Sequence, residues 1–212
     1  MLPFVTVWLV DGFWKAQLSK ADPAIFWTVD VVEWIVLPAL SLWLMHRAAP
    51  LSPRDYGVAW PGTSRFFVAL VLCTLTLAFA NDFGADNLGR RIFGDAPSAF
   101  SFGKLLSTSP VPAFVGAVYL ATTAAVCESV FLLALPWLWF SQGRNVSFGG
   151  KIAFALAASC VFALGHWENG WANALGALLF QLVAVAWYFR LRTLWPIIGA
   201  HFLIDLYLFG PK

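Results

Sequence analysis

Long apolar runs alternate with shorter polar segments along most of the chain. Six runs are long enough to predict helices that cross a bilayer, because about 20 apolar residues at roughly 1.5 Å each span the hydrocarbon core. They cover residues 24–45, 65–81, 112–140, 152–166, 171–189 and 193–209. Residues 1–19 form a weaker apolar run, interrupted by Asp11 and Lys15, which predicts an interfacial helix or an extra span. We therefore predict an all-α, polytopic transmembrane helix bundle with about six to seven spans.

The polar segments predict loops and an orientation. The longest polar segment, residues 82–111, is predicted to be a loop and contains Asp82, Asp86, Arg90, Arg91, Asp95 and Lys104. Segments 46–65, 141–151 and 190–192 hold most of the other basic residues, so the positive-inside rule places these segments in the cytoplasm. The turn after His166 is then expected on the outer side.

The composition agrees with a chain that lies in lipid. Hydrophobic residues make up 60% of the sequence and charged residues 11%, whereas soluble domains carry about 25% charged residues. The formal net charge of +2 gives no reason to expect a nucleic-acid partner. We expect one integral membrane domain, in which residues 1–111 provide N-terminal membrane helices and polar loops and residues 112–212 provide the helix bundle that carries the chemistry.

The termini and the cysteines exclude other arrangements. The three cysteines lie inside apolar runs without CxxC spacing, so neither a disulfide framework nor a zinc knuckle is expected. The chain does not open on a basic segment followed by an A-x-A site, so no cleaved signal peptide is expected.

Four ionisable side chains in the late spans are the candidate functional residues. A charged group at the centre of a membrane helix costs about 2.5 kcal/mol or more, so such groups turn inward and meet each other or water. The candidates are Glu128, His166, His201 and Asp205. His201 and Asp205 are four residues apart and share a helix face. A carboxylate can act as general base on water, an imidazole can orient that water, and donors on the last helix can stabilise an oxyanion.

Each candidate also has a structural explanation. Glu128 can be a buried acid paired with a hydroxyl such as that of Thr122 or Ser129, and His166 can be an interfacial histidine at a helix end. The pair of His201 and Asp205 can be a structural contact.

Two acids in the first span, Asp30 and Glu33, are expected to face water or to mark a misplaced helix boundary. On composition alone, a transporter, a structural membrane protein and a protease all remain open.

The local sequence around the histidines resembles a known family. Residues 162–166 read FALGH, an FxxxH pattern, and residues 201–205 read HFLID, an HxxxN/D pattern. The longer run 188–206 is similar to the last two helices of the CPBP family, which comprises CAAX proteases and bacteriocin-processing enzymes. The resemblance covers about residues 112–208, and the loop between Pro53 and Pro61 is similar to an early polar loop of that family.

The resemblance implies a glutamic intramembrane endopeptidase without a metal or another cofactor. In that family, the first Glu of an EExxxR motif and the FxxxH histidine activate water, and the HxxxN/D pair forms the oxyanion site. Carried over to this sequence, His166 would orient the water, and His201 with Asp205 would form the oxyanion site.

The first motif departs from the family pattern. Residues 127–132 read CESVFL where the family has EExxFR, so Cys127 takes the principal Glu position and Leu132 replaces Arg. A shift by one residue makes Glu128 the principal acid, with Leu133 in place of Arg. Phe131 and Pro136 favour the first register. Adjacent helix positions differ in direction by about 100°, so only one of the two side chains can face the histidines in a regular helix.

We therefore predict an integral membrane endopeptidase of a bacterial inner membrane that acts on a membrane-associated protein or peptide, including the C-terminal sorting tail of an exported protein. The alternative keeps the fold without catalysis, as a membrane scaffold, chaperone or immunity protein that binds a peptide. A proton-coupled transporter, a metal site built from Glu128, His166 and His201, and a Cys127 nucleophile beside His166 are further alternatives.

Overall fold

The computed structural model describes residues 3–11, 23–49, 52, 54–94, 110–141 and 144–210. Residues 3–11 are helical, and no strand occurs in these ranges. The other elements are α2 (Pro23–Val31), η1 (Val32–Val36), α3 (Leu37–Ala48), α4 (Thr63–Asp82), η2 (Phe83–Gly89), α5 (Arg90–Phe93), α6 (Pro110–Glu128), η4 (Ser129–Ala134), α7 (Leu135–Ser141), α8 (Phe148–Gly165), η5 (Trp167–Asn169), α9 (Trp171–Leu191) and α10 (Trp195–Phe209). The predicted interruption at Lys15 and the charges at Asp95 and Lys104 lie outside the described residues.

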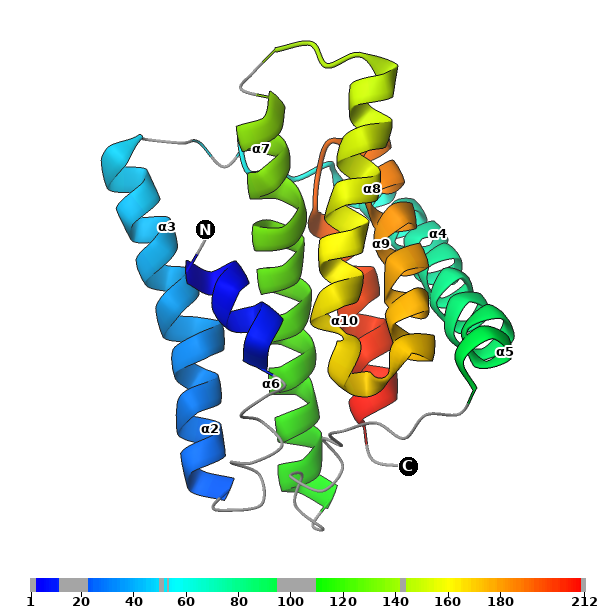
Figure 1. Cartoon of the computed structure of the whole chain (residues 1–212). Coiled ribbons are helices and arrows are strands. Elements are labelled where there is room, and N and C mark those ends of the chain that lie inside the picture. The colour runs from blue at the N-terminus through cyan, green and yellow to red at the C-terminus, as the bar shows by residue number, and fades with distance from the viewer. Residues whose placement is uncertain are drawn as a thin grey trace.

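The helices form a polytopic membrane bundle, as predicted. Five described helices are long and apolar enough to cross a bilayer: Ala24–Ala48, Thr63–Phe93, Pro112–Ser141, Phe148–Gly165 and Trp171–Leu191. The apolar helix Trp195–Phe209 is shorter. It packs against α4 and α6, and α9 packs against α8, α4 and η2 (Figure 1).

The predicted start of the long polar loop is wrong. Helix α4 continues through η2 and α5 to Phe93, so Asp82, Asp86 and Arg90 are helical. Arg90 pairs with Asp86 one turn earlier, at 3.1 Å between Nη2 and Oδ1. Glycine permits this extension to lie close to α9, since a Cβ on Gly84 would lie 2.7 Å from the Cα of Gly176. Polar residues therefore marked the end of an apolar run here, and not the end of a helix.

Two of the membrane helices contain a π-helical turn followed by a proline. In η1 the Leu37 amide donates to the Val32 carbonyl, and in η4 the Leu135 amide donates to the Val130 carbonyl, each five residues back. Pro38 and Pro136 follow directly. Proline has no amide hydrogen, so it cannot donate to the carbonyl four residues earlier.

Side chains from neighbouring helices donate to the two carbonyls that the prolines cannot serve, those of Trp34 and Leu132. Cys127 Sγ donates to the Trp34 carbonyl at 3.2 Å, four residues before Pro38. Gln181 Nε2 donates to the Leu132 carbonyl at 3.5 Å, four residues before Pro136. In a bilayer, where water is not at hand, such side-chain donors make a proline inside a helix tolerable.

The segment 54–62 fixes the start of the last helix. The Leu194 amide donates to the Gly57 carbonyl at 2.6 Å, and Thr193 Oγ1 donates to the Ala59 carbonyl at 2.8 Å. Gly57 has φ +70°, and a Cβ there would lie 2.8 Å from the Tyr188 ring, so glycine fits this turn. At the start of the segment, hydrogen bonds from the Ser52 hydroxyl and amide lower the pKa of Asp55.

Candidate functional site

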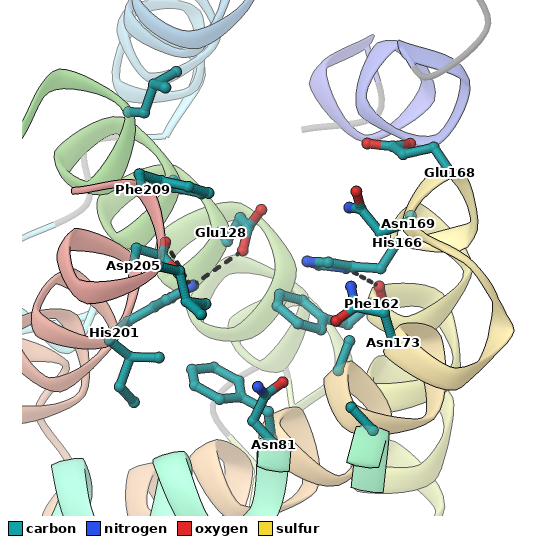
Figure 2. A pocket seen from close by; sticks show the side chains of 18 of the residues that line it. Asn81, Glu128, Phe162, His166, Glu168, Asn169, Asn173, His201, Asp205 and Phe209 are labelled. Atoms are coloured by element: carbon teal, nitrogen blue, oxygen red, sulfur yellow. Dashed lines mark hydrogen bonds and ion pairs between the residues drawn. The ribbon is translucent and has the colours of Figure 1, made fainter. Parts of the chain in front are cut away.

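A cavity of about 650 Å³ lies inside the bundle, and the four predicted site residues line it. Glu128 ends α6, His166 follows α8, and His201 and Asp205 lie on α10. Figure 2 shows Glu128, His201 and Asp205 on one side of the cavity and His166 on the other, with its imidazole directed across toward Glu128. The structure thus brings together side chains that lie up to 77 positions apart, from Glu128 to Asp205.

The two oxygens of Glu128 have different surroundings. The side chain is buried, and Oε1 accepts a hydrogen bond from Trp8 Nε1 at 3.2 Å. Oε2 lies 3.6 Å from His201 Nε2, which is a charge contact beyond hydrogen-bond distance. Among the described residues, no donor lies within hydrogen-bond distance of Oε2. This oxygen is buried, and its hydrogen-bonding capacity is not used by any described residue.

His201 lies between two carboxylates. Its Nε2 is 3.3 Å from Asp205 Oδ2 on the next turn of α10, in addition to its contact with Glu128. All three side chains are buried. A proton on this nitrogen is shared electrostatically by both acids, so the three groups act as one charge cluster.

The proton position on His166 follows from its contacts. Nδ1 lies 2.8 Å from the Phe162 carbonyl oxygen. A carbonyl only accepts hydrogen bonds, so Nδ1 carries the hydrogen, and in the neutral ring Nε2 is an acceptor. Nε2 is the ring nitrogen on the cavity side in Figure 2. His166 can thus accept a hydrogen bond from a water placed between itself and Glu128.

Glu128, and not Cys127, faces the cavity. Cys127 is buried against the first membrane helix and donates to the Trp34 carbonyl, away from the histidines. The alternative pairing of Glu128 with Thr122 is wrong, because the Thr122 hydroxyl donates to the Val118 carbonyl of its own helix at 2.6 Å. The contacts of Glu128 are Trp8 and His201, which come from other helices.

The expectation for Asp30 and Glu33 is wrong. Both are 3% exposed, inside a helix that runs without a break from Pro23 to Ala48, so they neither face bulk water nor mark a boundary. Asp30 Oδ2 accepts a hydrogen bond from the Tyr119 hydroxyl at 2.8 Å, and Asp30 lines the cavity.

Several cavity residues were not singled out by the sequence. They are Trp8, Asn81, Asn169 and Asn173. Trp8 resembles the many tryptophans of a membrane interface, and asparagine has no spacing that marks a site, so neither gave a signal. The described residues contain no group of three or more His, Cys, Asp or Glu side chains that could hold a metal ion.

The fold and this site together define a class: a polytopic helical membrane protein with an acid and two histidines around a cavity inside the bundle. Residues 110–207 match the family model of the type II CAAX prenyl endopeptidase Rce1-like proteins. This match confirms the CPBP resemblance over nearly the segment predicted to carry it, and the segment has the fold of CAAX-type intramembrane proteases. No curated protein and no solved structure gives a significant match to the chain.

Proposed function

We propose that the protein is a glutamic-type intramembrane endopeptidase that hydrolyses a peptide bond in a membrane-associated protein or peptide. The observation that supports this most is the placement of Glu128, whose buried carboxylate lines the same cavity as His166 and His201. The match of residues 110–207 to a protease family supports the same reaction class.

In the proposed mechanism, water is held between Glu128 Oε2 and His166 Nε2. Glu128 accepts a proton from the water as its oxygen attacks the carbonyl carbon of the scissile bond. His201, held by Asp205 at 3.3 Å, stabilises the negative charge on the carbonyl oxygen. The C–N bond then breaks as the proton on Glu128 passes to the leaving amine, which returns the carboxylate to its starting state.

The distribution of arginines between the two ends of the bundle supports a site that opens to the outer side of the membrane. The loops before α4, α8 and α10 carry Arg54, Arg144 and Arg192, and these loops lie at the same end of the bundle, opposite the turn after His166 (Figure 1). If that basic end is cytoplasmic, the site suits trimming of the C-terminal sorting tail of an exported protein, in the inner membrane of a bacterial cell.

A catalytically inactive scaffold, chaperone or immunity protein is the second candidate. The observation that favours it is the altered first motif, because the buried Leu132 and Leu133 offer no charge to hold a carboxylate ionised. Such a protein would bind a peptide in the same cavity without cleaving it.

The test is processing in cells of candidate substrates encoded near the gene. We expect the wild type to shorten one of them, and Glu128→Gln, His166→Ala and His201→Ala to leave it intact. Glu33→Gln is the matched control, because Glu33 is a buried acid that does not line the cavity. Intact substrate with the wild type, or processing by Glu128→Gln, would favour the binding protein instead.

A further inference from the structure

We propose that the N-terminal helix of residues 3–11 completes the site, and that Trp8 positions the Glu128 carboxylate so that Oε2 is the oxygen that takes the proton from water. This inference rests on the proposed function. The helix lies outside the segment 110–207 that matches the protease family, so the match gives it no role.

The contact between Trp8 and Glu128 is buried and specific. Trp8 is 3% exposed, and its indole Nε1 donates to Oε1 at 3.2 Å across 120 positions of sequence. An indole N–H only donates, so it cannot accept a proton from the carboxylate or exchange roles with it. It occupies Oε1 and leaves Oε2, on the side of the His201 contact, without a donor among the described residues.

The wall of the cavity is shaped around this indole. The Trp8 ring packs at 5.9 Å from both the Phe162 ring and the His166 ring. A Cβ on Gly165 would lie 2.0 Å from Cη2 of Trp8, which no side chain other than hydrogen permits without movement. The residue beside the water-orienting histidine is therefore compatible with Trp8 only as glycine.

Three further contacts dock the helix on either side of Trp8. Phe4 packs at 4.8 Å from Phe131 and 5.6 Å from Trp34, edge-on to the indole of the latter. Near the other end, Trp167 Nε1 donates to the Leu9 carbonyl at 3.3 Å. Trp8 is thus placed by its own helix, and its N–H is fixed in direction before a substrate arrives.

The Trp8 indole provides a stabilising contact to the Glu128 carboxylate that the family arginine does not provide in this sequence. With leucine at both positions that could correspond to the family arginine, the described contacts of the Glu128 carboxylate are one indole N–H and one imidazole. A hydrogen bond to an ionised carboxylate stabilises that form over the neutral acid. Trp8 thereby holds both the orientation and the charge of the proposed base.

The first experiment compares Trp8→Phe with the wild type on the substrate identified in the processing assay. Phenylalanine keeps an aromatic ring and loses the N–H. We expect kcat to fall about tenfold with KM almost unchanged, because hydrogen bonds to charged groups account for factors of about this size. Trp187→Phe is the matched control, since its indole donates to Thr76 Oγ1 on the outside of the bundle, and we expect wild-type kinetics for it.

Trp167→Phe separates positioning from docking. It removes an indole donor that holds the same helix but does not touch Glu128. If Trp167→Phe lowers kcat as much as Trp8→Phe does, docking of the helix explains the loss and the positioning role is overturned. A wild-type kcat for Trp8→Phe overturns it as well.

An NMR measurement tests the contact without any substrate. In protein labelled with ¹⁵N at the indoles, the signal absent from Trp8→Phe identifies Trp8, and we expect Glu128→Gln to move this signal more than any other indole signal. An unmoved signal overturns the inference even if the enzyme is active. Conversely, if Glu128→Gln still cleaves while the signal moves, the proposed base is wrong and the contact stands.

Discussion

The segments around η1 and η4 share one local construction but differ in what surrounds it. Each is a π-helical turn within a membrane helix, with a proline after it and a buried acid at its start: Glu33 within η1 and Glu128 directly before η4. In each, a side chain of another helix donates to the carbonyl that the proline cannot serve.

The difference lies in the neighbours of the acid. Helices α8 and α10 bring His166 and His201 to the cavity that Glu128 lines, whereas Glu33 is not among the residues that line it. A π-helical turn with a buried acid therefore occurs twice in the described part of the chain, and chemistry is expected only at the one that imidazoles approach.

The largest contrast is between Glu128→Gln and Glu33→Gln. Loss of a general base lowers the rate by about 100-fold or more. We expect a loss of this size for Glu128→Gln and near-normal processing for Glu33→Gln, measured as the rate of substrate shortening. Equal losses would mean that both acids act through the stability of the bundle.

The next contrast concerns Trp8, whose indole donates to Glu128 at the start of the second segment. Gly165→Ala pushes a methyl group into Trp8, and overpacking of this kind costs about 1–3 kcal/mol. We expect lower activity and a lower melting temperature in detergent.

Combining Gly165→Ala with Trp8→Phe tests whether the effect of Gly165→Ala comes from its clash with Trp8. The smaller phenyl ring leaves room for the methyl group, so the double variant should be less impaired than the sum of the single changes. Additive losses would show that the methyl group acts on something other than Trp8.

A smaller effect is expected at the carbonyl before Pro136. Gln181→Leu removes the amide that donates to Leu132, and an unsatisfied buried carbonyl costs about 1 kcal/mol or more. The melting temperature in detergent should fall. Unchanged stability would mean that the long 3.5 Å contact contributes nothing.

The smallest effect is expected at the carbonyl before Pro38. A thiol is a weak donor, so Cys127→Ala should lower the melting temperature less than Gln181→Leu does. Processing should continue at the normal rate, because Cys127 donates to Trp34 and does not line the cavity. Loss of processing with normal stability would instead support Cys127 as a nucleophile.

The sequence predicted the membrane helices well, because their apolar runs are long and each ends in polar residues. It failed at Asp82, Asp86 and Arg90, where a helix continues past its apolar part and Asp86 pairs with Arg90 on the next turn. Hydrophobicity reports where a helix is apolar and not where its hydrogen bonds stop.

The direction of the Glu128 side chain could not be predicted from the sequence, for a different reason. Register was inferred from Phe131 and Pro136, but η4 lies between Glu128 and Pro136, and a π-helical turn breaks the spacing of about 100° per residue. The contact with Trp8 was hidden because it joins positions 120 residues apart, and no motif links them. The positions of the histidines were predictable because each belongs to a short motif, one at the end of α8 and one within α10.

The wide separation in sequence between Trp8 and Glu128 also affects the order in which the site can assemble during synthesis. The helix of residues 3–11 is synthesised well before Phe131, Gly165 and Trp167, which pack against it. His201 and Asp205 follow last of all, on the final helix. A nascent chain that already contains Glu128 therefore lacks most of the cavity wall, and a truncated translation product cannot assemble the acid, both histidines and the indole. The wall of the cavity is therefore completed only after α10 has been synthesised.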